Sequence, residues 1–288
     1  MAKVALVTGA SSGIGEATAK RLLASNFIVY AGARRVDRMA ALADEGARIV
    51  PLDLTVDDSI ARAIGRIHDE HGRIDLLVNN AGYASYGAVE DVPMSEARRQ
   101  FEVNVFGLAR LIQLVIPAMR AQGQGRIINV SSMGGRGWDP LGAWYHATKF
   151  AVEGFSDSLR MELAPFGIKV VVIQPGATRT GWTAIALETL AAASGGTAYA
   201  SMATAKRRLF LAAVPFSSHP DVIARVVTRA ATVARPRTRY AVGAFAKPWI
   251  LASTFLPARL NDSITNVVTA LAARLTKDAG GRTRGDAG

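Results

Sequence analysis

The stretch Thr8-Gly-Ala-Ser-Ser-Gly-Ile-Gly15 decides the fold, because it joins a short apolar run, Val4-Ala-Leu-Val7, to a helical pattern. Gly9 permits a tight turn, Gly13 lets the backbone approach a ligand, and the last glycine lets the helix pack closely on the strand. The free N–H groups and positive dipole end of the helix favour an anion. The stretch therefore predicts a diphosphate-binding turn at the start of a βαβ unit.

Beyond this turn, short apolar runs alternate with helical patterns, which is the signature of a parallel α/β sheet. We expect strands near residues 3–8, 27–33, 48–52, 74–79, 125–131, 169–174 and 240–242, and helices near residues 15–25, 57–71, 95–121, 143–166 and 221–234. The predicted fold class is α/β: a single Rossmann-type, doubly wound parallel sheet of about seven strands, flanked by helices, with a C-terminal helical lid and extension.

The chain has 288 residues, half of them apolar, which suits one large core. We expect residues 1–245 to form one dinucleotide-binding catalytic domain that includes a substrate lid at about 181–218. Residues 246–276 are predicted to be an apolar and basic extension. The Gly-, Arg- and Asp-rich residues 277–288 are expected to be disordered.

The charge is uneven along the chain. The net charge is +11, and residues 201–288 hold 14 Lys or Arg against 4 Asp or Glu. The chain has no cysteine, which excludes disulfides and thiolate catalysis. No signal peptide, no run of 18 apolar residues and no nucleic-acid motif is apparent, and the four histidines show no metal-ligand spacing. We expect a cytoplasmic protein without a metal or a nucleic-acid partner, and peripheral contact with a membrane is the alternative location.

The end of the second predicted strand bears on which dinucleotide is bound. An NAD site would place an acidic residue there to accept bonds from the ribose hydroxyls, but the chain has Ala33 followed by Arg34 and Arg35. A guanidinium suits a 2′-phosphate. NADP(H) is therefore favoured over NAD(H). The alternative is that Arg34, Arg35 and Arg38 form only a solvated loop.

A candidate catalytic group follows from Tyr145-His-Ala-Thr-Lys149 in a predicted helix. The spacing of four puts Tyr145 and Lys149 on one helix face, where an ammonium would lower the pKa of the phenol. Ser132, near the end of the fifth strand, and Asn104, an amide on an apolar helix surface, could reach the same site. Each residue also has an ordinary structural explanation when it is taken alone.

These residues, with Asn79-Asn-Ala-Gly82 and Pro175-Gly176, resemble the short-chain dehydrogenase/reductase family over about residues 3–180. The resemblance implies that Tyr145 transfers the proton, Ser132 orients the carbonyl, Lys149 lowers the Tyr pKa and holds the nicotinamide ribose, and Asn104 supports a proton-relay water. The cofactor-binding residues that it implies, together with those named above, are Gly9, Ser11, Ser12, Gly13, Ile14, Gly15, Arg34, Arg35, Asp53, Asn80, Ala81, Gly82, Asn104, Tyr145, Lys149, Pro175, Gly176, Thr178 and Thr180.

The activity implied is that of an oxidoreductase acting on CH–OH donors, which interconverts a carbonyl and an alcohol. The chain looks most similar to the branch with 17β-hydroxysteroid and retinol dehydrogenases. Thr178 stands where an aliphatic residue is commoner in the family. A homodimer or homotetramer that pairs through the helices near 95–121 and 143–166 is implied by the resemblance alone.

The C-terminal third leaves several alternatives open. The apolar composition of 181–218 suits a small hydrophobic carbonyl or alcohol substrate such as a steroid, retinoid or lipid-like ketone, or else it merely packs on the core. The segment 244–260 could contact an anionic membrane surface, although core packing or dimer contact is favoured. The rival functions are a catalytically idle dinucleotide sensor and a membrane-surface binding protein.

Overall fold

The computed structural model describes residues 2–274 and contains one sheet of seven parallel strands in the order β3-β2-β1-β4-β5-β6-β7. The chain adds strands outward from β1 to β3 on one side of the sheet and then from β4 to β7 on the other. The strand order therefore reverses between β1 and β4, and ligands bind at such a switch point in open α/β sheets. The strands are β1 (Val4–Thr8), β2 (Ile28–Ala33), β3 (Arg48–Pro51), β4 (Leu76–Asn79), β5 (Gly125–Val130), β6 (Ile168–Pro175) and β7 (Arg239–Val242).

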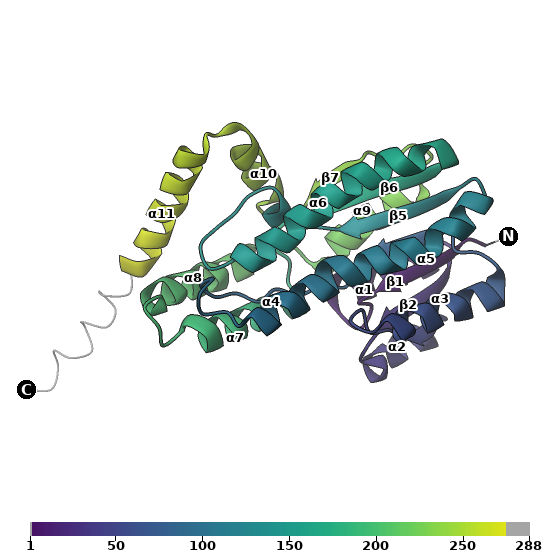
Figure 1. The fold of residues 1–288 in the computed structure, drawn as a ribbon, viewed down its shortest axis with the longest axis horizontal. Coiled ribbons are helices and arrows are strands. Elements are labelled where there is room, and N and C mark those ends of the chain that lie inside the picture. Colours follow the sequence, from purple (N-terminus) through teal and green to yellow (C-terminus); the bar gives the residue numbers. More distant parts are fainter. Residues whose placement is uncertain (1, 275–288) are drawn as a thin grey trace, which may run out of the picture.

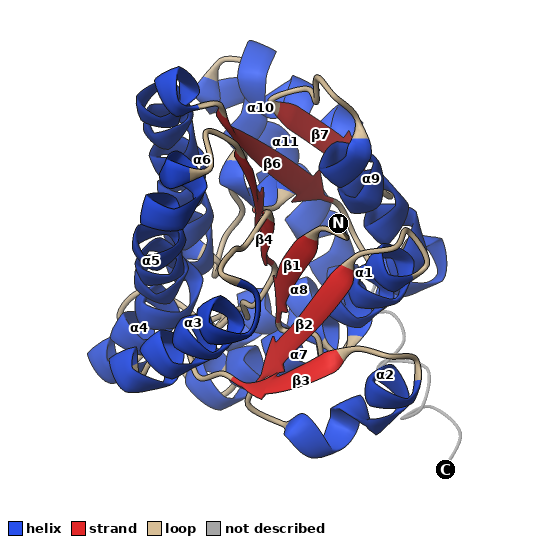
Figure 2. Ribbon diagram, turned by 90° about the vertical axis from the view of Figure 1, so that its right-hand side faces the viewer, coloured by secondary structure: helices blue, strands red, loops and turns tan. Residues whose placement is uncertain are grey.

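Helices cover both faces of this sheet, as Figure 2 shows, and this explains why the strands have continuous rather than alternating apolar sequence. All five residues of β1 and all four of β4 are buried. The helices are α1 (Gly13–Leu23), α2 (Ala40–Asp44), α3 (Asp57–His71), α4 (Met94–Phe101), α5 (Gly107–Ala121), α6 (Ala143–Leu163), α7 (Trp182–Ser194), α8 (Ala200–Ala213), α9 (Pro220–Thr232), α10 (Ala246–Phe255) and α11 (Ala258–Arg274).

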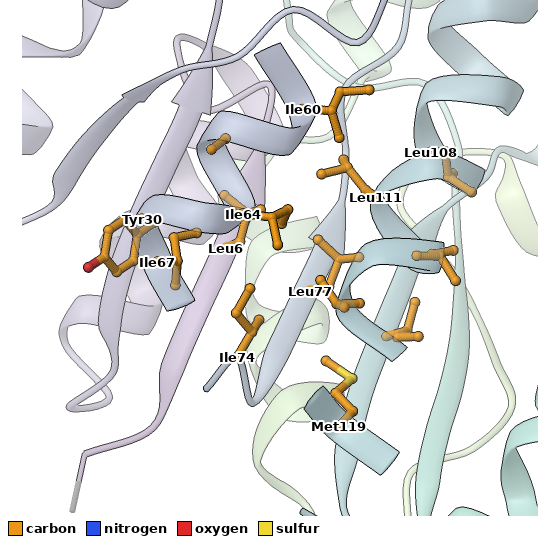
Figure 3. Close-up of a cluster of buried hydrophobic side chains, with 14 of the residues drawn as sticks. Leu6, Tyr30, Ile60, Ile64, Ile67, Ile74, Leu77, Leu108, Leu111 and Met119 are labelled. Carbon is orange, nitrogen blue, oxygen red and sulfur yellow. The ribbon is translucent and has the colours of Figure 1, made fainter. Parts of the chain in front are cut away.

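One hydrophobic core lies between the sheet and the layer of α3, α5 and α6. Figure 3 shows branched aliphatic side chains of α3 and α5 meeting those of the strands. Its members include Leu6, Leu77, Ile60, Ile64, Ile67, Leu108, Leu111 and Met119. A second core on the opposite face joins α1, α2 and α9 through Leu22, Leu42 and Val227. The two cores hold the sheet rigid, so its carboxyl edge can position a site.

The predicted fold class is confirmed, and the structure corrects some boundaries. The helix expected at 95–121 is not uniform, because a π-helical turn at Glu102–Phe106 separates α4 from α5. The third and fifth strands end at Pro51 and Val130, so Asp53 and Ser132 lie in the loops just beyond them. A π turn rotates the side chains that follow it and is frequent at functional sites.

The continuous helical region Met94–Ala121 is long and apolar enough to cross a membrane by length and composition. Its residues Leu111, Ile112 and Met119 are buried against the sheet, so packing of the core accounts for much of this apolarity. The sequence contains no run of 18 consecutive apolar residues; this region is apolar enough through its mean hydropathy, because polar residues interrupt its apolar stretches.

The C-terminal arm, defined as α10 and α11, folds back so that α11 packs against α8 (Figure 1). Trp138 donates a hydrogen bond from Nε1 to Asp262 of α11, at 2.8 Å, which ties the arm to the loop before α6. The tail predicted to be disordered, 277–288, lies outside the described residues.

Candidate functional site

The glycine turn between β1 and α1 is tightly enclosed. Gly9 has φ +67°, and a Cβ there would lie 2.9 Å from the Cα of Ala81. Gly13 has φ +61°, and a Cβ there would lie 2.9 Å from Cγ2 of Thr180. A side chain at either position would meet both steric and conformational strain. The turn therefore brings its backbone, the Ala81 segment and Thr180 close together.

The same turn is tied to the loop after β4. Thr8 Oγ1 accepts hydrogen bonds from the backbone N–H groups of Asn80 and Ala81, both at 3.0 Å, and Asn80 Nδ2 donates to the Thr8 carbonyl at 2.9 Å. Thr8 was not among the predicted site residues. A buried hydroxyl at the end of an apolar strand was the signal that could have identified it.

The start of α1 fits a diphosphate. The N-cap residue Ser12 makes no side-chain cap hydrogen bond, so its side chain leaves the first N–H groups of α1 to other acceptors. Ser11 and Ser12 are at least partly exposed, while the Ile14 side chain packs on the second core. Free N–H donors, a helix dipole and a cradle that excludes any Cβ suit an anionic diphosphate.

The adenosine end of this candidate site carries positive charge. Ala33 is buried, whereas Arg34 and Arg35 are exposed. Asp53 Oδ1 accepts from the N–H and hydroxyl of Thr55 at 2.9 and 2.8 Å. Burial acts to raise the pKa of Asp53, but these bonds and the charges of Arg34 and Arg99 lower it overall.

Arg99 lies on α4, with its guanidinium 5.6 Å from the centre of the Tyr83 ring. Both Arg34 and Arg99 act on the pKa values of Asp53 and Tyr83. The two arginines therefore flank one region, which fits a phosphate on the ribose. Sequence reasoning did not identify Arg99, because α4 is remote from β2 in the chain.

On the far side of the turn, the loop after β6 brings the remaining predicted contacts together. A Cβ on Gly176 would lie 1.9 Å from the Ala244 carbonyl oxygen, so only glycine fits there. Thr178 Oγ1 donates to the Gly176 carbonyl at 2.9 Å, and Thr180 Oγ1 accepts from the N–H of Trp182 at 3.3 Å. Pro175 ends β6 and directs this loop toward Gly13.

The π turn places Asn104 between the loop after β4 and α6. Its Oδ1 accepts from the Tyr83 N–H at 3.1 Å, and its Nδ2 donates to the Tyr83 carbonyl at 2.9 Å and to Thr148 Oγ1 at 3.1 Å. A Cβ on Gly82 would lie 3.0 Å from Asn104 Oδ1 and 3.7 Å from Lys149 Nζ. Asn104, Gly82 and Lys149 therefore converge.

Tyr145, Lys149 and Ser132 come together at the carboxyl end of β5. Tyr145 and Lys149 are buried, and Lys149 Nζ lies 6.0 Å from the centre of the Tyr145 ring. Lys149 Nζ donates to the Val130 carbonyl at 3.0 Å. Ser132 Oγ accepts from the Gly134 N–H at 3.0 Å, and Ser132 lies close enough to the Tyr145 phenol to lower its pKa. A phenol, an ammonium and a hydroxyl thus share one site.

The ionisation of this group differs from the sequence expectation. Burial raises the pKa of Tyr145 to about 12, opposed by the Ser132 hydroxyl and assisted by the Asp139 carboxylate. Burial lowers the pKa of Lys149 to about 8, opposed by Glu153. Desolvation is the largest cause acting on the pKa values of both groups, and the lowering of the phenol pKa by Lys149 stays a prediction.

Behind Lys149, a buried polar chain holds α6 on the sheet. Glu153 accepts from Gln174 Nε2 at 3.0 Å through one oxygen and from Arg239 Nε at 2.9 Å through the other. These residues come from α6, β6 and β7, so sequence reasoning did not find them. Within residues 2–274, no group of three His, Asp or Glu side chains could hold a metal ion.

In front of Tyr145 lies an aromatic cluster made of Tyr86, Tyr145, Trp182 and Phe210. The Trp182 ring centre is 5.4 Å from that of Tyr145, and the Tyr86 ring centre is 5.1 Å from that of Phe210. Trp182 begins α7 and Phe210 belongs to α8, so the segment 181–218 covers the phenol. Tyr86 was missed, because nothing in the local sequence distinguishes it from a core residue.

Comparison with known sequences gives the same picture over most of the chain. The family model described as short chain dehydrogenase matches residues 3–190. The uncharacterized oxidoreductase YusZ of Bacillus subtilis is 44% identical over 62% of this chain, and a 3-ketodihydrosphingosine reductase of Bacteroides thetaiotaomicron is 40% identical over 63%. The chain spans 66% of the length of each of these two relatives. The uncharacterized oxidoreductase YbbO of Escherichia coli is 32% identical over 92% of this chain and 94% of its own.

Solved structures agree in fold over 80% or more of this chain. A short-chain dehydrogenase from Streptomyces avermitilis has a TM-score of 0.76 and 32% identity, covering 100% of this chain and 99% of its own. A metagenomic short-chain oxidoreductase in complex with NADP has a TM-score of 0.66 and 29% identity, over 83% and 95% of the two chains. A 3-ketoacyl-(acyl-carrier-protein) reductase from Brucella melitensis, complexed with NADH, has a TM-score of 0.68 and 29% identity, and the match covers 80% of this chain and 93% of the other. The chain belongs to the short-chain dehydrogenase family of oxidoreductases.

Proposed function

We propose that this protein is an NADP(H)-dependent oxidoreductase that interconverts a carbonyl and a secondary or primary alcohol on a hydrophobic substrate. The observation that carries the proposal is the convergence of Tyr145, Ser132 and Lys149 beside the glycine turn of α1. A catalytically idle sensor would not need this complete set, and that alternative is not favoured.

The chain's own residues have distinct parts in this reaction. NADP(H) supplies or accepts the hydride when it is bound. The phenol of Tyr145, protonated at neutral pH because burial raises its pKa, donates a proton to the carbonyl oxygen as negative charge develops there. The Ser132 hydroxyl orients the same oxygen, while Lys149 holds a positive charge nearby.

The test of this mechanism is Tyr145→Phe, which removes the transferable proton and keeps the ring in the aromatic cluster. We expect turnover of a hydrophobic ketone with NADPH to fall at least about a hundredfold, while NADPH binding, measured by fluorescence titration, stays within about twofold. Wild-type turnover in this variant would refute the proposed function.

The preference for NADP(H) rests on Arg34, supported by Arg99, because both charges act at Asp53. Structural neighbours exist with NADP and with NADH, so the neighbours leave the preference open. We expect Arg34→Ala to weaken NADPH binding by about ten- to a hundredfold and NADH binding very little. Arg38→Ala, an exposed change in the same segment, is the control and should leave both affinities unchanged. Equal losses for the two cofactors would argue against a 2′-phosphate site.

The hydrophobic substrate is inferred from the aromatic cluster and the buried lid residues Ala186, Leu190 and Ala203. One relative is named for the reduction of a sphingoid ketone, which is a lipid-like substrate. We expect kcat/KM for 2-ketones to rise with chain length, by about threefold or more for each buried methylene. A kcat/KM that does not depend on chain length would contradict this substrate class. The resemblance to the branch with steroid and retinol dehydrogenases stays a prediction.

We also propose that the C-terminal arm contacts an anionic membrane surface. Leu260, Ile264, Val267 and Val268 follow one face of α11 and are exposed, as is Phe255 of α10 at 76%. Lys247 and Arg259 are exposed cations on the same arm. An apolar helix face with basic neighbours is the pattern of interfacial helices. Co-sedimentation with vesicles containing phosphatidylserine should fall in an Ile264→Asp and Val267→Asp double variant, and unchanged binding would dismiss the contact.

Self-association through α5 and α6 is proposed from exposed large apolar side chains, which are Phe106 in the π turn before α5 and Phe150, Phe155 and Met161 on α6. Exposed apolar side chains that gather on one face mark protein–protein contacts. Light scattering after gel filtration should show a dimer or tetramer, and Phe150→Asp should shift it toward the monomer. A monomeric wild type would contradict this proposal. Cytoplasmic location stays a prediction.

A further inference from the structure

A buried ion pair that the proposed reaction does not use lies next to the aromatic cluster. The Lys206 ammonium of α8 contacts Oδ2 of Asp139, which belongs to the loop before α6. The Lys206 side chain is 6% exposed and that of Asp139 is 20% exposed. Burying two charges is costly, and a hydrophobic pair of similar volume would hold a lid at least as well. The pair therefore calls for an explanation other than stability.

His146, which follows Tyr145 on α6, contacts the same Asp139 as Lys206 does. Its Nδ1 lies 2.9 Å from the Gly134 carbonyl, and because a carbonyl oxygen only accepts, Nδ1 carries a proton. Its Nε2 lies 3.0 Å from Asp139 Oδ1 and 3.2 Å from the Asp139 backbone nitrogen. These contacts hold Asp139 against His146, the residue that follows Tyr145 on α6.

Lys206 reaches the aromatic cluster as well. Its Nζ lies 5.3 Å from the centre of the Tyr86 ring and 5.0 Å from that of Phe210, at distances where a cation is attracted to a ring face. In the described part of the chain, Lys206–Asp139 is the one ion pair that joins residues 181–218 to the rest of the protein. This ion pair therefore links the lid to the loop before α6, close to the aromatic cluster that contains Tyr145.

The ionisable groups around Tyr145 are Lys149 and His146 on α6, Asp139 in the preceding loop, Tyr86 in the loop after β4, and Lys206 on α8. Glu153 lies behind Lys149. The Asp139 charge acts to raise the pKa values of both Tyr145 and Tyr86. Burial opposes ionisation of Asp139, but Lys206 and His146 bring its pKa down to about 2, so it is a carboxylate at neutral pH.

We propose that Lys206 is a positioning residue of the lid, whose ion pair with Asp139 closes α8 over Tyr145 and cancels the carboxylate charge beside the phenol. The inference rests on the proposed function. When the lid opens, Lys206 leaves and Asp139 faces Tyr145 uncompensated, which keeps the phenol protonated. When the lid closes over a substrate, the carboxylate charge is balanced, so the phenolate form of Tyr145, which accepts the proton of an alcohol, is less disfavoured. Lid closure and proton transfer are coupled in this way.

The first test follows the lid alone and needs no substrate. Hydrogen exchange of the peptide covering residues 200–213 is measured by mass spectrometry in the wild type, Lys206→Met and Lys206→Arg, with the α3 peptide as the internal reference. We expect Lys206→Met to speed exchange of α8 by about tenfold or more, and Lys206→Arg to stay close to the wild type. Equal exchange in all three proteins would overturn the lid contact.

The second test follows the charge. Oxidation of 2-decanol with NADP⁺ at pH 8 is compared in the wild type, Lys206→Met, Asp139→Asn and the Asp139→Asn, Lys206→Met double variant. An unpaired carboxylate near the phenol should lower kcat in Lys206→Met by roughly tenfold. The double variant, which lacks the carboxylate, should recover most of this kcat, while both variants should have a higher KM than the wild type because the lid contact is missing. A purely structural contact would give a double variant at least as slow as Lys206→Met.

The double variant also keeps the test valid if Lys206→Met does not fold, because it buries no unpaired charge. It must then show faster exchange of α8 together with a kcat near that of the wild type, and the absence of either result overturns the proposal. Tyr145→Phe distinguishes a failure of the proposed Lys206 role from a failure of the proposed function. If it is inactive and the charge variants behave like the wild type, only the role of Lys206 fails; if it is fully active, the proposed function itself fails.

Discussion

Replacing Gly15 with alanine tests whether the close packing of the glycine turn excludes a side chain at this position. Gly15 is buried in the first turn of α1, and a Cβ there would lie 2.3 Å from the Gly9 carbonyl oxygen and 2.5 Å from Asn80 Nδ2. Ordinary contacts of this kind begin at 3.4 Å, so the methyl group intrudes by about 1 Å on two partners. Forcing an extra carbon into a packed site costs about 1–3 kcal/mol.

Gly65→Ala is the matched control, because Gly65 also lies within a helix, α3, and a Cβ there meets nothing within 4 Å. Both variants gain helix propensity of roughly 0.5–1 kcal/mol, so the difference between them isolates the clash. We expect Gly65→Ala to be at least as stable as the wild type in urea unfolding, and Gly15→Ala to be less stable than the control by about 1–3 kcal/mol.

The clash also displaces Asn80, whose amide is bonded to the Thr8 carbonyl, and so opens the cradle of the diphosphate. A loss of about 1.4 kcal/mol in binding would weaken NADPH affinity by roughly tenfold in a fluorescence titration. The control should bind NADPH like the wild type. If Gly15→Ala is as stable as Gly65→Ala and binds NADPH equally well, the argument from close approach at this turn is wrong.

Three further outcomes follow from the structure. Because burial raises the pKa of Tyr145 to about 12, the phenolate fraction and the rate of alcohol oxidation should rise by roughly tenfold for each pH unit between about 7 and 10, whereas carbonyl reduction should change little; a flat oxidation profile would contradict this. Met119→Ala, at a fully buried site in the first core, should lower the free energy of unfolding by about 2–5 kcal/mol in urea without changing NADPH affinity, and a loss below about 1 kcal/mol would show that the site collapses. Asp139 has its pKa lowered from 3.8 to about 2, so its contribution to stability is present above pH 3.8 and is lost as the pH falls toward 2; Asp139→Asn should flatten this limb of the stability profile, and an unchanged limb would refute the assignment.

Much of the fold followed from local pattern. The apolar runs at β1, β4 and β5 are buried on both faces, which makes them continuous in sequence, and α3 was predicted at the residues where it lies. Glycine spacing predicted the turn, since the backbone angles of Gly9 and Gly13 are ones that other residues adopt at a cost. The π turn at Asn104 was missed, because its residues are compatible with an ordinary helix and only the contacts with Tyr83 and Thr148 favour the wider turn.

The ionisation of the site could not be predicted in the same way. A spacing of four does place Tyr145 and Lys149 on one face, but burial, which is a tertiary feature, is the main cause of the pKa shifts of both residues. Arg99, Tyr86, Asp139 and Lys206 belong to four segments that meet only after folding. No local pattern marks such residues, since their role arises from neighbours that are distant in the chain.

The sequence by itself determined the class of fold, the glycine turn and the identity of the candidate acid and its partners, because backbone conformation and residue spacing are local properties. The tertiary structure alone decided which charges face the phenol and what covers it, because desolvation and Coulomb interaction depend on distances between segments far apart in the chain.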